Sequence, residues 1–217
     1  MVEHPIQRVI SDIANTLVTI DSSKVPFQTR SRSYSPGVGP YGEPQLLKKI
    51  SSILNKNDAY HRKIVTRRTP DLLIHGSWAL EFKIIRPFGD NGKEAENWSV
   101  NLLHPYEGNQ SSLGDCLKLC NLHIPERKAV VVIGFEHNPP VIPLEPLIES
   151  FELLAQEILS IQLGPRIVER RENLIHPIHQ QLSVIAWEVL GKGESSEHLP
   201  EKKANGTPDW KNFILQI

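Results

Sequence analysis

The feature that most constrains the fold is an almost continuous apolar run over residues 128–135. Its length suits a strand and falls far short of the roughly 20 apolar residues that span a bilayer. A strand that is apolar on both faces is typical of the centre of a sheet covered by helices on both sides. The run therefore predicts an α/β fold, and 217 residues are most simply one domain.

Two amphipathic helices are predicted before this run. Apolar residues recur every three or four positions over residues 5–20, and again after Glu43, where Pro44 stands in the first helical turn. The intervening residues 21–42 are rich in Ser, Pro, Gly and Arg, which predicts a loop or arm.

Three short strands are predicted next, at residues 63–67, 71–74 and 78–85. Residues 75–77 form a tight turn, so the last two strands are expected to pair as a hairpin. Residues 86–110 are predicted to be irregular, and loops of that length are often functional. The remaining expected elements are a helix from Ser111 or Ser112, an acidic helix over 147–159, strands within 166–176 and 179–190, and a polar tail from 191.

Charged residues interrupt the two hairpin strands. Asp71 begins the second strand, Glu81 and Lys83 share one face of the third, and Phe82 points to the opposite face. Two carboxylates beside a lysine can bind a hard divalent cation and orient water. The alternative is a structural ion pair among the same residues, although a buried strand has little structural reason to carry them.

The residues Pro70, Asp71, Glu81, Phe82 and Lys83 resemble the motif of the PD-(D/E)xK nuclease superfamily, which includes many type II restriction endonucleases. The order of helix, three-strand meander, helix and strand over about residues 43–136 resembles the restriction-endonuclease-like core of that family. The resemblance implies a Mg²⁺-dependent DNA endonuclease, with Mn²⁺ as a substitute. It also implies that Asp71, Glu81 and the Phe82 carbonyl hold the metal and that Lys83 positions or activates water.

Glu43 is a further catalytic candidate. Some members of the superfamily complete the metal site with an acid from the first core helix, and Glu43 stands at the start of that helix. The alternative is an ordinary helix-start acid that the helix dipole favours. Asp90 and Asp115 are expected to be turn and helix-start residues.

The charge distribution is consistent with a polyanionic partner. The whole chain has a formal charge of 24 − 25 = −1, but residues 24–93 carry 13 − 5 = +8 and the rest −9. The alternative is that the two regions interleave in space and their fields cancel. The predicted phosphate contacts are Arg30, Arg32, Arg67, Arg68, Arg86, Lys93 and Ser112, and the predicted readers of base edges are Asn97, Asn101 and Asn109. The alternatives are helix capping for Ser112 and ordinary loop amides for the three asparagines.

Residues 1–42 and 137–217 extend the minimal core within what is expected to be a single nuclease domain. By analogy, such extensions suit a homodimeric type II restriction-type enzyme that cuts double-stranded DNA at a specific site. Three alternatives remain: a repair or recombination nuclease on structured DNA, a non-catalytic nucleic-acid-binding module with the same fold, and an unrelated α/β protein whose motif is coincidence.

A cytoplasmic location is expected, because the first residues carry neither the basic nor the apolar region of a signal peptide. Cys116 and Cys120 lie four residues apart and form a C-x3-C-x2-H pattern with His123. Since a structural zinc needs four ligands and no second cluster is apparent, two core thiols are the preferred interpretation.

Overall fold

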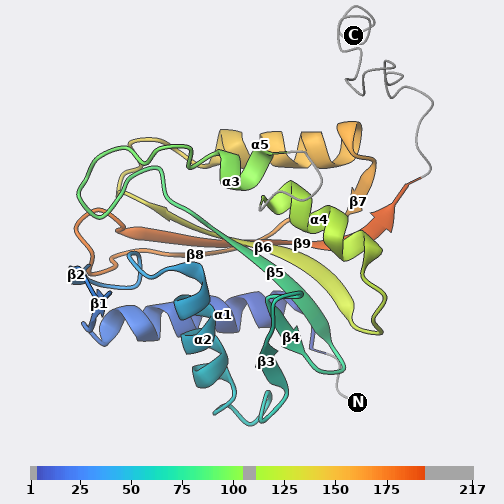
Figure 1. Ribbon diagram of the computed structural model, residues 1–217, viewed down its shortest axis with the longest axis horizontal. Coiled ribbons are helices and arrows are strands. Elements are labelled where there is room, and N and C mark those ends of the chain that lie inside the picture. The colour runs from blue at the N-terminus through green and yellow to red at the C-terminus, as the bar shows by residue number, and fades with distance from the viewer. Residues whose placement is uncertain (1–3, 105–110, 194–217) are drawn as a thin grey trace, which may run out of the picture.

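The computed structural model describes residues 4–104 and 111–193. It is a mixed α/β structure with a helix-rich N-terminal part and a multi-strand mixed sheet (Figure 1). The helices are α1 (Ile6–Ser22), α2 (Glu43–Leu54), α3 (Val100–Leu103), α4 (Ser112–Asn121) and α5 (Glu145–Leu153), which continues into the π-helical turn η1 (Leu154–Ile158). The strands are β1 (Pro26–Gln28), β2 (Ser33–Pro36), β3 (Ile64–Thr66), β4 (Leu72–Ile74), β5 (Trp78–Ile85), β6 (Arg127–Glu136), β7 (Ile161–Leu163), β8 (Ile167–Arg171) and β9 (Gln181–Lys192).

The main sheet has the strand order β3-β4-β5-β6-β9-β7, and β8 also pairs with β9. Strands β5 and β6 are parallel, whereas the pairs β3-β4, β4-β5, β6-β9, β7-β9 and β8-β9 are antiparallel. Strand β6 lies between β5 and β9, and its residues 129–135 are buried. The predicted buried central strand is therefore confirmed.

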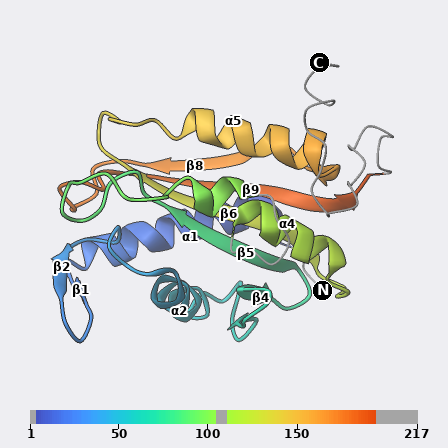
Figure 2. The ribbon, with the colours of Figure 1, turned by 45° about the horizontal axis from the view of Figure 1, so that its top comes forward.

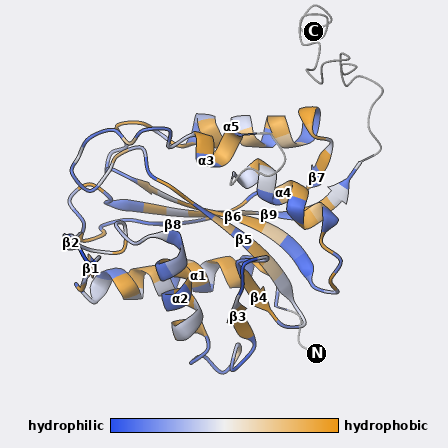
Figure 3. Cartoon of the chain, viewed as in Figure 1, coloured by the Kyte–Doolittle hydropathy of each residue, from blue (hydrophilic) through white to orange (hydrophobic). Residues whose placement is uncertain are grey.

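Helices cover both faces of the sheet. Helices α1 and α2 lie on one side, and α3, α4 and α5 on the other (Figures 1 and 2). The alternation of β5 divides its side chains between the two faces. Leu80, Phe82 and Ile84 join the core under α1 and α2, whereas Ile85 joins the core under α4 and α5. In Figure 3, α5 alternates between hydrophobic and hydrophilic colour, as expected for a helix with one apolar face.

Most predicted elements are confirmed, and the differences have local causes. The acidic helix begins at Glu145, because Pro146 is tolerated in its first turn, and it ends in a π-helical turn. The arm is not entirely irregular, since β1 and β2 pair and the rings of Phe27 and Tyr34 approach within 5.3 Å. Strand β7 is only three residues long, too short to leave a periodic signal, and α3 is a single turn within the predicted irregular segment.

Asn109 and the tail from residue 194 lie outside the described residues. None of the helices in the described ranges is long and apolar enough to cross a membrane. Cys116 is buried and Cys120 partly buried, both as free thiols. Burial raises the pKa of both thiols, as expected for cysteines that pack in a core.

Candidate active site

The candidate site lies along one edge of β5, where its pairing with β4 ends. The register of these two strands stops at Leu72 and Leu80, because β4 begins only at Leu72. Asp71 lies directly before β4. Its carboxylate is next to the first backbone N–H group on that edge of β5 beyond the end of the β4 pairing. The backbone N–H of Phe82 donates to Asp71 Oδ2 over 2.8 Å. A short strand thus leaves room for a carboxylate where a ladder hydrogen bond would otherwise form.

Lys83 Nζ contacts oxygen atoms of three residues at this edge, two by ion pairs and one by a hydrogen bond. Its Nζ lies 2.7 Å from Asp115 Oδ2 and 3.9 Å from Glu43 Oε1. It also donates to the Phe82 carbonyl over 2.8 Å. Burial lowers the pKa of Lys83, but the carboxylates of Asp115 and Glu43 outweigh burial and raise it above its ordinary value. The ammonium group is therefore held in place by residues from three separate elements.

Glu81 is buried beside Asp71 and is only 3% exposed. Burial raises its pKa to about 9, assisted by a hydrogen bond with Asp71 and by the negative charges of Asp71 and Asp115. Its Oε1 is buried and has no hydrogen-bond partner among the described residues. Two carboxyl groups this close share a proton more readily than they carry two charges, unless a cation lies between them.

Glu43 reaches the same edge from the start of α2. Gly42 precedes the helix and Pro44 follows in its first turn, so the helix begins with the carboxylate aimed at β5. Burial raises the pKa of Glu43 to about 7, and Lys83 and a hydrogen bond from the Ile84 backbone oppose this shift. Glu43 therefore forms an ion pair with Lys83 at this edge, and its role in metal binding stays a prediction.

Asp115 lies in the first turn of α4, as predicted. The sequence does not predict that its side chain is fully buried between Lys83 and Lys118. Lys118 Nζ donates to its second oxygen over 2.7 Å. Its position in the first turn of α4 carries no sign of this role in the sequence, because the contact joins residues 32 positions apart.

The donor set fits a hard divalent cation in part. The described residues contain no group of three or more His, Cys, Asp or Glu side chains arranged to hold a metal ion. Mg²⁺, however, keeps several waters and binds through one or two carboxylates plus substrate oxygens. Glu81 Oε1 is buried and has no hydrogen-bond partner among the described residues, and it lies next to Asp71. These two carboxylates are enough for a Mg²⁺ site of this kind. The Phe82 carbonyl accepts from Lys83, so this lysine would have to move for the carbonyl to bind a cation.

The predicted phosphate contacts fall into two groups. Arg67 and Arg68 are exposed, and the Arg67 backbone N–H donates to the Asp71 carbonyl over 3.2 Å, which places the Arg67 backbone beside the site. Arg30, Lys93, Asn97 and Asn101 are also exposed. Arg32 is exposed too, but it pairs with Asp90 over 3.0 Å and lies over the Tyr34 ring.

Two predicted DNA contacts require correction. Arg86 is partly buried, because Tyr41 at the end of the arm lies against it and the Tyr41 carbonyl accepts from its guanidinium group. Burial lowers the pKa of Arg86 to about 10. Ser112 is fully buried at the first position of α4, where Ser111 provides the cap. Neither side chain lies on the surface as a free phosphate contact.

Comparison of the chain with protein-family models, with curated proteins and with solved structures finds no match.

Proposed function

We propose that the protein is a Mg²⁺-dependent DNA endonuclease of the restriction-endonuclease-like type. The observation that carries the proposal is that Asp71, Glu81 and Lys83 come together along the edge of β5, where its pairing with β4 has ended. Their spacing in the sequence resembles the superfamily motif, and their side chains lie within one small polar cluster inside an otherwise apolar sheet. The element order α2-β3-β4-β5-α4-β6, with β5 parallel to β6, supports the same proposal.

Asp71 and Glu81, with the Phe82 carbonyl, would hold the ion. A bound Mg²⁺ supplies Lewis-acid stabilisation of charge on the phosphate oxygens and a more acidic water. Lys83 places its ammonium group beside the scissile phosphate, where a fixed cation stabilises the charge that builds up in the transition state. Asp115 in α4 and Glu43 in α2 form ion pairs with that ammonium group. These contacts limit its motion before substrate binds.

Arg67 and Arg68 provide exposed positive charge directly before Asp71. Phosphate contacts of this kind set affinity and register along the backbone of a duplex. A restriction-type enzyme that cuts both strands needs two such sites, so we propose double-stranded DNA as the substrate and a homodimer as the working unit.

The test is cleavage of a mixture of plasmid, phage and genomic DNA by the full chain with Mg²⁺, and with Mn²⁺ as the alternative ion. We expect discrete fragments, whereas a smear would favour a structure-dependent or nonspecific nuclease over a restriction-type one. Lys83→Ala should reduce cleavage by about 100-fold or more, because a positioned charge in a dry site contributes on that scale. Its binding to DNA should persist.

Lys56→Ala is the matched control, since Lys56 is an exposed lysine just after α2. It should cut like the wild type. Absence of cleavage of duplex and single-stranded DNA with both metals would overturn the proposal. Equal cleavage by Lys83→Ala and Lys56→Ala would overturn the role given to Lys83.

A further inference from the structure

A pocket of about 310 Å³ opens where β5 ends. Its wall contains the aromatic residues Tyr34, Phe88 and Trp98 and the polar residues Arg86, Asn101 and His179. Since a strand rises about 3.3 Å per residue, Arg86 follows Lys83 by about 10 Å along the chain. The pocket therefore lies close to the candidate active site, and its volume stands at the lower end of the range for small-ligand sites.

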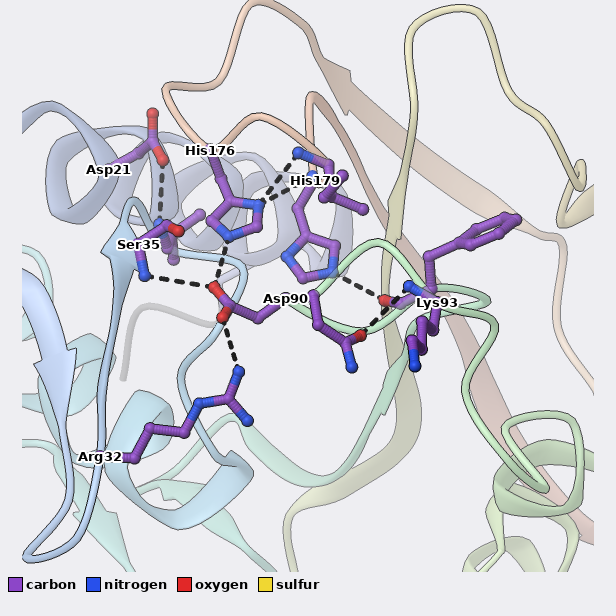
Figure 4. Close-up of polar contacts among 11 residues, drawn as sticks. Asp21, Arg32, Ser35, Asp90, Lys93, His176 and His179 are labelled. Atoms are coloured by element: carbon purple, nitrogen blue, oxygen red, sulfur yellow. Dashed lines mark hydrogen bonds and ion pairs between the residues drawn. The ribbon is translucent and has the colours of Figure 1, made fainter.

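Asp90 lines this pocket. Figure 4 shows the polar contacts of its carboxylate. Its Oδ1 accepts from the Ser35 backbone over 3.2 Å and lies 2.9 Å from His176 Nε2. Its Oδ2 accepts from Arg32 over 3.0 Å. Burial raises the pKa of Asp90, but these partners outweigh burial and lower it. Three segments distant in sequence are thereby tied together by a single carboxylate.

His176 and His179 extend this hydrogen-bonded cluster. His176 Nδ1 accepts from the backbone N–H groups of Ile178 and His179, which assigns its proton to Nε2 and makes it a donor to Asp90. His179 Nε2 lies 2.9 Å from the Phe88 carbonyl and donates to it, and the two imidazole rings stack at 4.4 Å. Gly39 permits this packing, because a Cβ there would lie 2.3 Å from His179 Nδ1. These hydrogen bonds and this ring stacking hold the pocket wall together.

Arg86 leaves a donor unused at this pocket. Its Nη2 donates to the Tyr41 carbonyl, whereas its Nε is buried with no hydrogen-bond partner among the described residues. A buried donor without an acceptor is unfavourable, so a ligand that supplies an acceptor would be stabilised there. The exposed amide of Asn101, at the same pocket, offers both a donor and an acceptor.

The composition of the wall selects the class of ligand. The carboxylates of Asp90 and Glu96 also line the pocket, and they would repel a phosphate group. Aromatic rings beside amide and guanidinium groups instead suit a flat heteroaromatic ring with polar edges, which is the chemistry of a nucleobase. We propose that the pocket binds one unstacked nucleobase of the DNA, close to the phosphate that Lys83 contacts. This inference rests on the proposed function.

The experiment is photo-crosslinking of the full chain to random-sequence DNA duplexes in which 5-iodouracil replaces thymine. A chelator is present so that the DNA stays intact. A halogenated base stacked on an aromatic ring crosslinks to it on irradiation, and peptide mass spectrometry identifies the residue. We expect crosslinks at Tyr34, Phe88 or Trp98. Crosslinks confined to other residues, or an absence of crosslinks, would overturn the proposal.

A matched pair of variants tests the polar edge of the pocket. Asn101 lies in α3 and lines the pocket, whereas Asn121, the last residue of α4, is exposed and is not part of the wall. Asn101→Ala should reduce the crosslinking yield at the pocket aromatics by about fivefold. Asn121→Ala should change the yield by less than about twofold, since this exposed residue is not part of the pocket. Equal yields from the two variants would contradict the inference.

Cleavage by the same preparations separates this inference from the proposed function. Cleavage without crosslinks at the pocket would overturn only the nucleobase site. Crosslinks at the pocket without cleavage in Mg²⁺ or Mn²⁺ would support the nucleobase site and overturn the endonuclease. The absence of both cleavage and crosslinks at the pocket would overturn both proposals.

Discussion

Lys83 Nζ and Asp115 Oδ2 lie 2.7 Å apart and join the middle of β5 to the first turn of α4. The Asp115 side chain is fully buried, and the Lys83 side chain is only 11% exposed. An ion pair this far from water survives only with good geometry and further partners. Lys83 has the Phe82 carbonyl, and Asp115 has Lys118, so both charges are compensated.

Asp115→Asn should leave Lys83 in the site but remove the charge that fixes its ammonium group. Because Asn retains the shape of Asp, we expect the fold to persist and the turnover rate of DNA cleavage to fall about tenfold. The Michaelis constant should change little, since Asp115 is buried and does not face the substrate. Single-turnover and steady-state cleavage rates measure both quantities.

Lys118→Met is the control for this variant, because it removes the other partner of Asp115 and leaves the pair with Lys83 intact. Its side chain is 39% exposed, so we expect cleavage to change by about twofold or less. If both variants lose the same activity, Asp115 acts through the packing of α4 rather than through Lys83.

Asp21→Asn should destabilise the protein by about 2 kcal/mol. The Asp21 carboxylate is 3% exposed and accepts from two backbone groups, those of Val38 and Ile175, each over 2.9 Å. An Asn side chain presents an N–H₂ group to one of these donors. Urea denaturation gives the free energy of unfolding. The exposed Asp58→Asn is the control, and a loss there as large as at Asp21 would contradict this explanation.

His179 makes stability depend on pH. Burial lowers the pKa of His179 from 6.5 to about 4, so between these pH values the unfolded chain binds the proton that the folded chain rejects. The free energy of unfolding should therefore fall as pH drops from 6.5 to 4, by at most about 3 kcal/mol from this residue. His179→Gln keeps a donor for the Phe88 carbonyl but does not titrate.

Denaturation of the wild type and of His179→Gln across this pH range measures the contribution. The difference between the two proteins should shrink as the pH falls, because only the wild type bears the cost of a neutral histidine. Parallel stability curves would show that His179 does not titrate in this way.

Ser111→Ala should destabilise the protein by about 1 kcal/mol. The Ser111 hydroxyl accepts from the Gly114 backbone over 3.0 Å and donates to the His104 carbonyl, so it joins α4 to the segment before it. Ser99→Ala is the matched control, because Ser99 precedes α3 and its side chain makes no capping hydrogen bond. Thermal and urea unfolding should separate the two variants.

The strands, the main helices and the Asp71, Glu81 and Lys83 set could be predicted because their signals are local. Alternation places Glu81 and Lys83 on one face of β5, and the hairpin brings Asp71 to its edge. The burial of Arg86 could not be predicted in this way. A basic residue after a strand is usually solvated, but here the arm passes over it and the Tyr41 carbonyl accepts from it.

The sequence by itself determined the alternation of strands and helices and the residues that stand next to one another on β5, since these follow from backbone periodicity. The tertiary structure alone decided that Asp115 holds Lys83, and that Arg32, Asp90 and His176 meet beside one pocket. The physical reason is distance along the chain. Such contacts depend on how helices and loops pack across the sheet, and no short-range pattern records which polar groups that packing brings together.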